Sequence, residues 1–317
     1  MSGSMVSSTD LKHKALELGF MSVGVCEALP APHLAAYEDW IAKGYHGSME
    51  YLARHVPLKA NPTELLPDAA SIVAVALNYY QPNPAVPGEP HLATYALGRD
   101  YHRVIRGRLK KLAAWIEIEY PGSHNRACVD SAPILERDYA HMAGLGWFGK
   151  NTCLIDSKRG SWFFIGLLLT SVKFEADAPA LGACGTCRAC IEACPTGAIV
   201  FEEGRWQVDA RSCVSYLTIE HEGEIPPDLR QGIGDWTFGC DICQSVCPFN
   251  QPRESQPLRA GLTTEPDFLN RRQWPNLKHI QQMDEVQWDE LTNGSAIRRT
   301  GLRGIRRNAE INLQNGS

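Results

Sequence analysis

Long hydrophobic runs are absent from this sequence. The longest uninterrupted one extends from Trp162 to Leu169, whereas a helix that crosses a membrane needs roughly 20 consecutive apolar residues. The N-terminus also lacks the basic segment and the apolar stretch of an export signal. These absences lead us to expect a cytoplasmic protein with no membrane partner.

An excess of basic residues is absent as well. The 31 lysines and arginines are outnumbered by 36 aspartates and glutamates, so the net charge is −5. Such a balance excludes a uniformly basic nucleic-acid coat protein, although an average conceals local patches. Residues 251–317 contain ten basic and eight acidic residues, so this segment is positive in an otherwise acidic chain.

Cysteine, by contrast, is abundant, with 11 residues. In the reducing cytoplasm, cysteines serve metal or redox chemistry more often than disulfides, and an odd number also fits disulfide pairing poorly. A length of 317 residues and a hydrophobic content of 44% indicate one main core with smaller attachments.

Hydrophobic periodicity predicts an α+β or α/β core. A long amphipathic helix is expected at 102–120, because Ile105, Leu109, Leu112 and Ile116 fall on one face. The other expected elements are helices at 11–18 and from Pro133 to about Leu145, and strands at 20–26, 71–78 and 162–170.

Three domains are expected along the chain. Residues 1–176 form the α+β core, and residues 177–250 form an appended ferredoxin-like module that contains most of the cysteines. Residues 251–317 form a short helical C-terminal region, with a helix predicted from Ser295 to Asn312.

The cysteines follow the spacing of bacterial ferredoxins. The run Cys184-x2-Cys187-x2-Cys190-x3-Cys194-Pro195 is typical of [4Fe-4S] binding, and its fourth cysteine ligates the other cluster. A second run, Cys240-x2-Cys243-x3-Cys247-Pro248, repeats half of the first, and Cys213 lies between them. This crossing-over predicts two clusters, one held by Cys184, Cys187, Cys190 and Cys247, the other by Cys194, Cys213, Cys240 and Cys243.

The alternative for these eight cysteines is a pair of zinc sites. Zinc sites usually present two C-x2-C pairs and need neither the tandem triple spacing nor the Cys-Pro ends, so the pattern favours iron-sulfur. The remaining Cys26, Cys128 and Cys153 are expected to be small buried hydrophobic residues.

Two other motifs are weak. Gly144-x-Gly146-x-x-Gly149 matches a dinucleotide fingerprint, but it follows a predicted helix where that fingerprint requires a strand. Asp138-x-x-His141-x-x-Gly144 is one residue too long for a cobalt-ligating histidine motif, so His141 is expected to be a surface or packing residue.

Several segments together resemble the epoxyqueuosine reductase family. They are the cysteine runs, Cys128-Val-Asp130, Gly146-Trp-Phe-Gly-Lys150-Asn151, Cys213-Val-Ser215-Tyr216, Phe238-Gly-Cys240-Asp241, and the tail from Gly294 to Asn308. The resemblance implies a cobalamin enzyme that reduces epoxyqueuosine to queuosine at the wobble position of tRNA. It also implies base-off cobalamin in an α/β N-terminal domain, reduced through the clusters by an external low-potential donor.

The resemblance also implies roles for individual residues. Asp130 matches the family's proton donor, which would require burial to raise its pKa; the alternative is a helix-capping carboxylate. The expected cofactor contacts are Arg54, Tyr101, His102, Asp130, Lys150, Asn151, Ser215 and Asp241, of which Tyr101 and His102 resemble a substrate-side loop of the family. The alternative for these residues other than Asp130 is that they are ordinary surface groups or groups that support the site from behind.

An arginine-rich stretch near the C-terminus predicts a contact with tRNA. It contains Arg298, Arg299, Arg303, Arg306 and Arg307 without an acidic residue. In one helix Arg299, Arg303 and Arg306 would share a face able to contact phosphates, although a solvated helix face is the alternative.

Two other functions stay open at this point. One is a corrinoid reductive dehalogenase, although such enzymes usually carry an export signal and use a tyrosine as the acid. The other is a ferredoxin-type electron carrier without an active site, which the large N-terminal domain disfavours.

Overall fold

The main core is an antiparallel sheet. The computed structural model describes residues 6–252 and 261–316. Its sheet has the order β1 (Ser22–Glu27), β2 (Ser71–Asn78), β7 (Phe163–Thr170) and β4 (Asn125–Cys128), and every neighbouring pair is antiparallel. The core is therefore of the α+β kind. The three predicted strands are confirmed, with small shifts at their ends.

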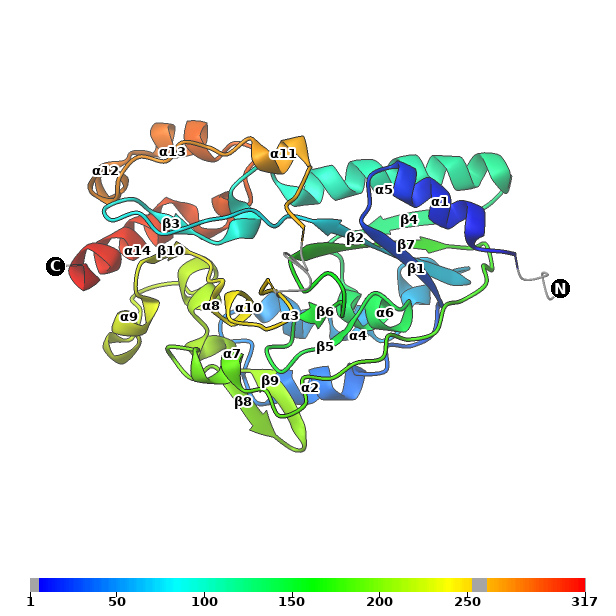
Figure 1. Ribbon diagram of the computed structural model, residues 1–317, viewed down its shortest axis with the longest axis horizontal. Coiled ribbons are helices and arrows are strands. Elements are labelled where there is room, and N and C mark those ends of the chain that lie inside the picture. The colour runs from blue at the N-terminus through cyan, green and yellow to red at the C-terminus, as the bar shows by residue number, and fades with distance from the viewer. Residues whose placement is uncertain (1–5, 253–260, 317) are drawn as a thin grey trace.

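Helices cover both faces of this sheet (Figure 1). On one face Val73 of β2 packs with α1 (Thr9–Glu17) and α5 (Tyr101–Glu119). On the other face the adjacent Ile72 packs with α6 (Glu136–Met142). Because successive residues of a strand point to opposite faces and both faces are covered, β2 is apolar along nearly its whole length.

Helix α5 confirms the amphipathic prediction. Its predicted apolar face is fully buried, from Ile105 to Ile116. The helix begins at Tyr101 because the side chain of Asp100 accepts a hydrogen bond from the backbone N–H of His102 at 3.0 Å. This cap fixes the position of His102 at the first turn.

Helix α6 is shorter than predicted. It begins at Glu136, with Leu135 as the residue before it, and Pro133 lies outside the helix. The chain turns sharply at Asp130, whose φ of 49° lies in the left-handed region, so residues between Asp130 and Leu135 form a loop. Asp130 is therefore not the cap of this helix, and the capping alternative is wrong.

The segment between β1 and β2 forms short helices below the sheet. They are α2 (Leu34–Ala42), α3 (Glu50–Arg54), α4 (Val56–Lys59) and the 3-10 turn η1 (Pro62–Glu64). The hairpin of β5 (Trp147–Phe148) and β6 (Leu154–Ile155) lies nearby. The Gly144 to Gly149 motif follows α6 and leads into this hairpin. It does not form the strand-to-helix turn of a dinucleotide site, which agrees with the interpretation of the sequence.

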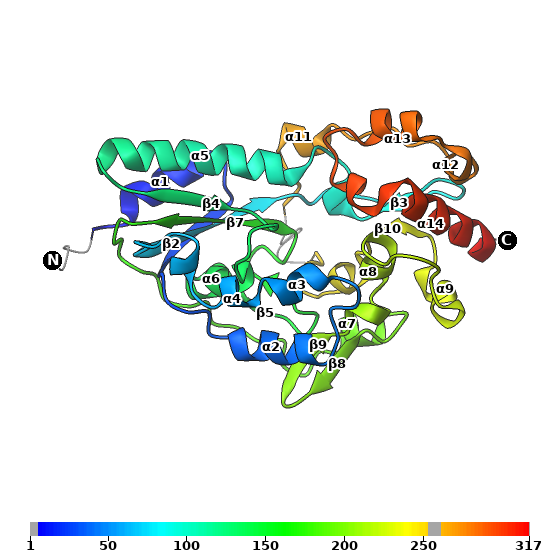
Figure 2. The ribbon, with the colours of Figure 1, turned by 180° about the vertical axis from the view of Figure 1, so that it is seen from behind.

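The cysteine-rich segment folds into small elements that join the first part of the chain. They are α7 (Ala189–Glu192), β8 (Ile199–Glu202), β9 (Arg205–Val208), η3 (Ala210–Ser212), α8 (Val214–Ile219), α9 (Pro227–Ile233), β10 (Trp236–Phe238) and α10 (Ile242–Ser245). Strand β10 pairs in parallel with β3 (His91–Leu92), which η2 (Thr94–Ala96) follows. In both ribbon views the β8–β9 hairpin lies beside α2 (Figures 1 and 2), and Trp40 Nε1 donates to the carbonyl of Val208 at 2.7 Å.

The C-terminal region is helical but not continuous. Its elements are α11 (Pro266–Leu269), α12 (Leu277–Gln282), α13 (Glu285–Thr292), η4 (Ala296–Thr300) and α14 (Gly301–Asn315). The single helix predicted for 295–312 is wrong, because Gly301 has a φ of 68° and separates η4 from α14. No helix in the part of the chain that the structure describes is long and apolar enough to cross a membrane.

Helix α14 is bound to the cysteine-rich segment by buried polar groups. Asn308 is fully buried, and its Nδ2 donates to the carbonyls of Thr218 and Thr237 at 2.7 and 2.9 Å. Asn312 likewise donates to the carbonyl of Trp236 at 3.2 Å. Since α8 follows Cys213 and β10 precedes Cys240, these hydrogen bonds hold two predicted ligand segments against α14.

We expect Asn308→Ala to lower the free energy of unfolding by about 2 kcal/mol, because the buried carbonyl of Thr237 loses this donor and that of Thr218 retains the hydroxyl of Thr300. Urea denaturation under anaerobic conditions, followed by tryptophan fluorescence, measures this loss. Glu310→Ala, at an exposed position of the same helix, is the control and should change the free energy by less than about 0.5 kcal/mol. Equal losses in both variants would contradict the assignment.

Candidate active site

Four of the predicted cluster ligands surround one small cavity. Its lining includes Cys184, Cys187, Cys190 and Cys247, which are distant in sequence and brought together by α7 and the segment after α10. In a [4Fe-4S] cluster each cysteine binds a different iron, so four ligands are expected around a cavity and not at one point. This grouping is the one that crossing-over predicts.

The other four predicted ligands are also close neighbours. Burial raises the pKa of Cys213 to about 11, and the charges of Cys243 and Cys194 contribute. Burial likewise raises the pKa of Cys240, with contributions from Cys243 and Cys213. Because these thiols hold their protons in the absence of metal, binding of a cluster here would release them.

The two groups of cysteines lie beside each other, and polar residues of the β5–β6 hairpin hydrogen-bond to both. Cys243 contributes to the raised pKa of Cys190, whose first cause is burial. Lys150 Nζ donates to the carbonyls of Gly185 and Cys187, both at 2.8 Å. Asn151 Nδ2 donates to the carbonyl of Cys243 at 3.2 Å. Lys150 and Asn151, predicted to contact cobalamin, thus hold the ligand loops of both groups.

The three remaining cysteines differ from one another in surroundings. Cys26 and Cys128 are buried in the apolar core next to α6, as predicted. Cys153 is not in that core: it hydrogen-bonds to Cys243. The prediction that Cys153 is a buried hydrophobic residue is therefore wrong, because the β5–β6 hairpin places it next to a ligand of the predicted second cluster.

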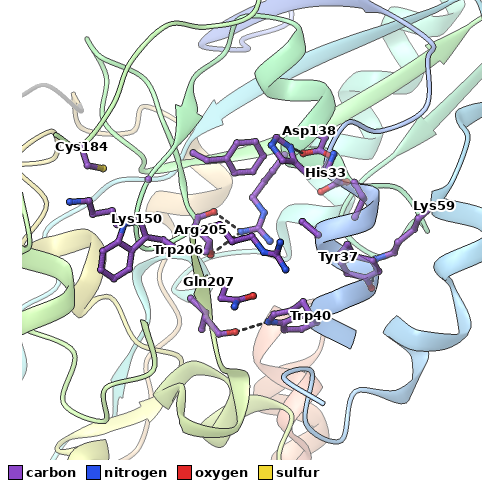
Figure 3. A pocket seen from close by; sticks show the side chains of 18 of the residues that line it. His33, Tyr37, Trp40, Lys59, Asp138, Lys150, Cys184, Arg205, Trp206 and Gln207 are labelled. Atoms are coloured by element: carbon purple, nitrogen blue, oxygen red, sulfur yellow. Dashed lines mark hydrogen bonds and ion pairs between the residues drawn. The ribbon is translucent and has the colours of Figure 1, made fainter. Parts of the chain in front are cut away.

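A much larger cavity, of about 850 Å³, adjoins the first group of cysteines (Figure 3). Residues of α2, α6, β9 and the β5–β6 hairpin line it, and so does Cys184. A volume of this size is typical of a site for a large organic ligand. Because Cys184 lines both cavities, a ligand in the large one would lie next to a cluster in the small one.

Two residues that line this cavity each have one polar atom without a hydrogen-bond partner among the described residues. Gln207 Oε1 and Arg205 Nε are buried without a hydrogen bond, and both residues line the cavity. Trp206 and Trp40 add apolar surface beside them (Figure 3). The guanidinium of Arg205 also pairs through Nη2 with Asp39 and Glu203, and Gln207 Nε2 donates to Glu202. Amide and guanidinium groups in a partly apolar wall fit a large ligand that carries amide groups at its edge, as a corrin does.

Lys59 is a buried cation in the cavity wall that the sequence reasoning missed. Its exposed fraction is 8%, and its Nζ donates to the hydroxyl of Tyr37 at 3.0 Å. Burial lowers the pKa of Lys59 to about 8, and the nearby Arg137 contributes. An anionic group in the cavity would offset this cost. The predicted Arg54 is exposed and does not line the cavity. Nothing in the sequence indicates that Lys59 is buried in the cavity wall while Arg54 is exposed.

A second feature of the wall that the sequence reasoning missed is a histidine paired with a carboxylate. His33 Nδ1 lies 2.7 Å from Asp138 Oδ1 (Figure 3), and this hydrogen bond raises the pKa of His33. His141, in contrast, bonds through Nδ1 to the carbonyl of Gly146 at 2.9 Å. It is a packing residue, as predicted.

Asp130 lies at the edge of the large cavity and pairs with His102. Asp130 Oδ2 is 3.0 Å from His102 Nε2, and His102 Nδ1 is 2.7 Å from Asp100 Oδ1. Tyr101 stacks on the ring of His102, with centroids 4.0 Å apart. The cavity, the turn at Asp130 and the start of α5 thus bring three predicted site residues together.

The expected rise in the pKa of Asp130 is wrong. The Asp130 side chain is 59% exposed at the cavity edge, and partial desolvation by its neighbours acts to raise the pKa of its carboxyl. The hydrogen bond and charge of His102 outweigh this effect and hold the pKa below its usual value. Glu136 differs: burial, with the charge of Asp130, raises its pKa to about 8. At neutral pH the proton therefore resides on His102 and Glu136 and not on Asp130.

Ser215 and Asp241 do not line the large cavity. Asp241 is buried, and its Oδ2 accepts a hydrogen bond from the backbone N–H of Thr94 at 2.7 Å. It thereby ties the segment between Cys240 and Cys243 to the N-terminal part of the chain. Ser215 lies in α8, two residues after Cys213.

The five arginines near the C-terminus do not form one stripe. Arg299 forms an ion pair with Glu220 at 2.7 Å, and Arg298 pairs with Asp289 at 2.5 Å. Two further arginines, both on α14, bond to backbone carbonyls. Arg307 donates to the carbonyls of Leu217, His221 and Gly223, and Arg306 donates to the carbonyl of Met283. Arg303 is exposed on α14. The predicted common face is wrong because the chain breaks at Gly301.

Comparison with known proteins identifies two family matches. Residues 183–250 match the family described as "4Fe-4S double cluster binding domain". Residues 59–131 match the family described as "Epoxyqueuosine reductase QueG, DUF1730". The first match contains all eight predicted cluster ligands, and the second contains Lys59, His102 and Asp130.

Full-length relatives carry the same name. The chain is 44% identical to epoxyqueuosine reductase of Vibrio cholerae, over 97% of this chain and 83% of the relative. It is 43% identical to that of Escherichia coli, over 96% of this chain and 80% of the relative.

Solved structures agree with these relatives. An epoxyqueuosine reductase crystallised with an epoxyqueuosine-modified tRNA-Tyr stem loop has a TM-score of 0.83 at 26% identity, over 98% of this chain and 81% of that one. The Bacillus subtilis enzyme, whose catalytic aspartate loop is swung out of the active site, also scores 0.83, at 27% identity and the same coverage. A reductive dehalogenase shares the fold alone, with a TM-score of 0.50 and 16% identity over 97% of this chain and 36% of that one. With relatives above 40% identity over nearly its whole length, the chain belongs to the epoxyqueuosine reductases, oxidoreductases that act on tRNA.

Proposed function

We propose that this chain reduces epoxyqueuosine to queuosine at the wobble position of tRNA with a base-off cobalamin held in the large cavity. The adjoining cysteine groups hold two [4Fe-4S] clusters that pass electrons from an external low-potential donor of the cytoplasm. The observation that carries this proposal is the position of Cys184, which lines both the cluster cavity and the large cavity.

The residues of the large cavity suit a corrin with its nucleotide tail. Gln207 and Arg205 would supply an amide and a guanidinium group to peripheral amides, and Trp206 and Trp40 offer apolar surface. Lys59 would neutralise the phosphodiester of the tail. When bound, reduced cobalamin supplies a strong nucleophile or one-electron reductant for the epoxide. We assign this site to residues 1–176 together with the β8–β9 hairpin.

Asp130 is the proposed proton donor to the epoxide oxygen. Its side chain is 59% exposed at the cavity edge, where a substrate base can reach it. An alkoxide leaving group needs such an acid, and a carboxyl at hydrogen-bond distance is suited to the task.

The C-terminal region is the proposed contact to the tRNA backbone. Arg303 is exposed, and Arg298 and Arg299 retain about half of their side-chain exposure despite their ion pairs. These three reach phosphates more readily than Arg306 and Arg307, whose guanidinium groups bond to backbone carbonyls. We propose that Arg306 and Arg307 mainly stabilise the fold through these hydrogen bonds, in addition to any contact that they make with tRNA.

An anaerobic assay tests the function directly. The protein, with reconstituted clusters, cobalamin and a strong chemical reductant, is incubated with tRNA that carries epoxyqueuosine, and the nucleosides are then analysed. We expect queuosine to appear only when cobalamin is present. Unchanged epoxyqueuosine in the complete mixture would refute the proposal, and queuosine without cobalamin would refute the role of the cofactor.

We expect Lys59→Met to weaken cobalamin binding by about tenfold, because the variant loses a buried cation opposite the phosphodiester while it keeps the length of the side chain. Anaerobic titration with cobalamin, followed by absorbance, measures the dissociation constant. Lys110→Met, at an exposed position of α5, should bind as the unchanged protein does. Equal affinity for cobalamin in both variants would refute the proposed contact between Lys59 and the cofactor.

A further inference from the structure

The start of α5 holds a histidine between two carboxylates. His102 Nδ1 lies 2.7 Å from Asp100 Oδ1, and His102 Nε2 lies 3.0 Å from Asp130 Oδ2. A carboxylate only accepts hydrogen bonds, so an imidazole that bonds to a carboxylate through each nitrogen must donate from both. Only the imidazolium form has two N–H groups. The pKa values of Asp100 and Asp130 both lie below their usual range, so both are ionised at neutral pH and the two contacts require the imidazolium.

We propose that His102 is the proton reservoir of Asp130, so that Asp130 passes to the epoxide oxygen the proton that His102 holds. This assignment rests on the proposed function and extends it to a second acid–base residue. Asp100 acts as a positioning residue, because it fixes the ring through Nδ1 and leaves Nε2 to face Asp130.

The electrostatics of the pair agree with its geometry. Burial acts to lower the pKa of His102, but the hydrogen bonds to Asp100 and Asp130 raise it to about 9. The same contact lowers the pKa of Asp130 against the effect of its partial desolvation. The pair thus stores one proton on nitrogen at neutral pH, and Asp130 lies between that nitrogen and the cavity.

Other titratable and charged groups face the pair from the elements packed around it. They are Tyr51 from α3, Lys59 from α4, Tyr95 from η2, Tyr101 and Arg103 from α5, Glu136 and Arg137 from α6, and Arg299 from η4. Glu136 is the nearest further carboxyl, and its Oε1 accepts the backbone N–H of Asp130. Since burial raises the pKa of Glu136 to about 8, it adds little negative charge below that pH.

The proton inventory matches the reaction. Conversion of the epoxide to an alkene breaks two C–O bonds, takes up two electrons and two protons, and releases the oxygen as water. The low-potential donor supplies the electrons one at a time through the clusters. As the first C–O bond breaks, the proton on His102 moves through Asp130 to the oxygen. The side chain of His102 is 25% exposed, so water can recharge it for the second proton.

The test compares His102→Gln with the unchanged protein in single turnovers over a range of pH. Both proteins carry reconstituted clusters and cobalamin, and are reduced before epoxyqueuosine tRNA is added. A glutamine keeps a hydrogen-bond donor near Asp130 but stores no proton. We expect the rate of the unchanged protein to fall only above about pH 9, and that of the variant to fall from about pH 6, which amounts to a loss of about a hundredfold at pH 8. Binding of the tRNA should stay within about twofold.

A second measurement does not depend on turnover. Nitrogen NMR of histidine-labelled protein with oxidised clusters and no cobalamin should show His102 as an imidazolium at pH 7.5, and Asp130→Asn should lower the pKa of His102. A neutral His102 at that pH, or equal pH profiles of the two proteins, would overturn the proposal. If the unchanged protein makes no queuosine while His102 is an imidazolium, the proposed function is refuted, but the storage of a proton on His102 beside Asp130 is not.

Discussion

Asp130→Asn is expected to reduce the rate of epoxyqueuosine reduction by about a thousandfold. General acid catalysis contributes roughly 10² to 10⁴ to a rate, and the amide has the shape of the carboxyl but cannot relay a proton from His102. The substitution also removes one of two carboxylates that hold His102 as an imidazolium, so both the donor and its supply are lost. Single-turnover analysis of nucleosides under anaerobic conditions measures the effect.

The assembly of the site should survive this change. Asp130 is not a predicted cluster ligand, and its side chain is 59% exposed, so iron content, cobalamin affinity and binding of the tRNA stem loop should be close to those of the unchanged protein. Asp10→Asn, which alters an exposed carboxylate in the first turn of α1, is the matched control and should retain full activity. A rate for Asp130→Asn within about tenfold of the control would mean that another group donates the proton.

Cys247→Ala should lower the iron content from about eight to about four atoms per chain, since Cys247 lies with Cys184, Cys187 and Cys190 around one cavity. The cluster next to the large cavity would be lost, and turnover with it, because electrons could no longer reach the cofactor through that group. Iron and sulfide analysis after anaerobic reconstitution measures the first effect, and the nucleoside assay measures the second.

The control for this change is Cys128→Ala. Cys128 is buried in the apolar core next to α6, so its replacement should keep about eight irons with at most a modest loss of stability. The grouping of the cysteines would be wrong if Cys247→Ala kept all its iron. Zinc in place of iron in the unchanged protein would refute both clusters.

The sequence alone determined the cluster motif, the family and the main elements of the core. Cysteine spacing carries this information locally, because a cubane needs its ligands at fixed separations along the chain. The apolar period of α5 and the uninterrupted run of β2 also predicted buried faces, since burial follows directly from the spacing of apolar residues. Asp130 could be named only through the resemblance of its segment to the family.

The tertiary structure decided how these parts act on one another. The site is built from α2, α6, β9 and the β5–β6 hairpin, and Lys59 gains its significance only from burial in that shared wall. The pKa of Asp130 depends on His102, 28 positions earlier in the chain, and the arginine stripe was lost to a single backbone turn at Gly301. Long-range contacts and local backbone angles fix these properties, and neither is visible in the periodicity or spacing of the residues.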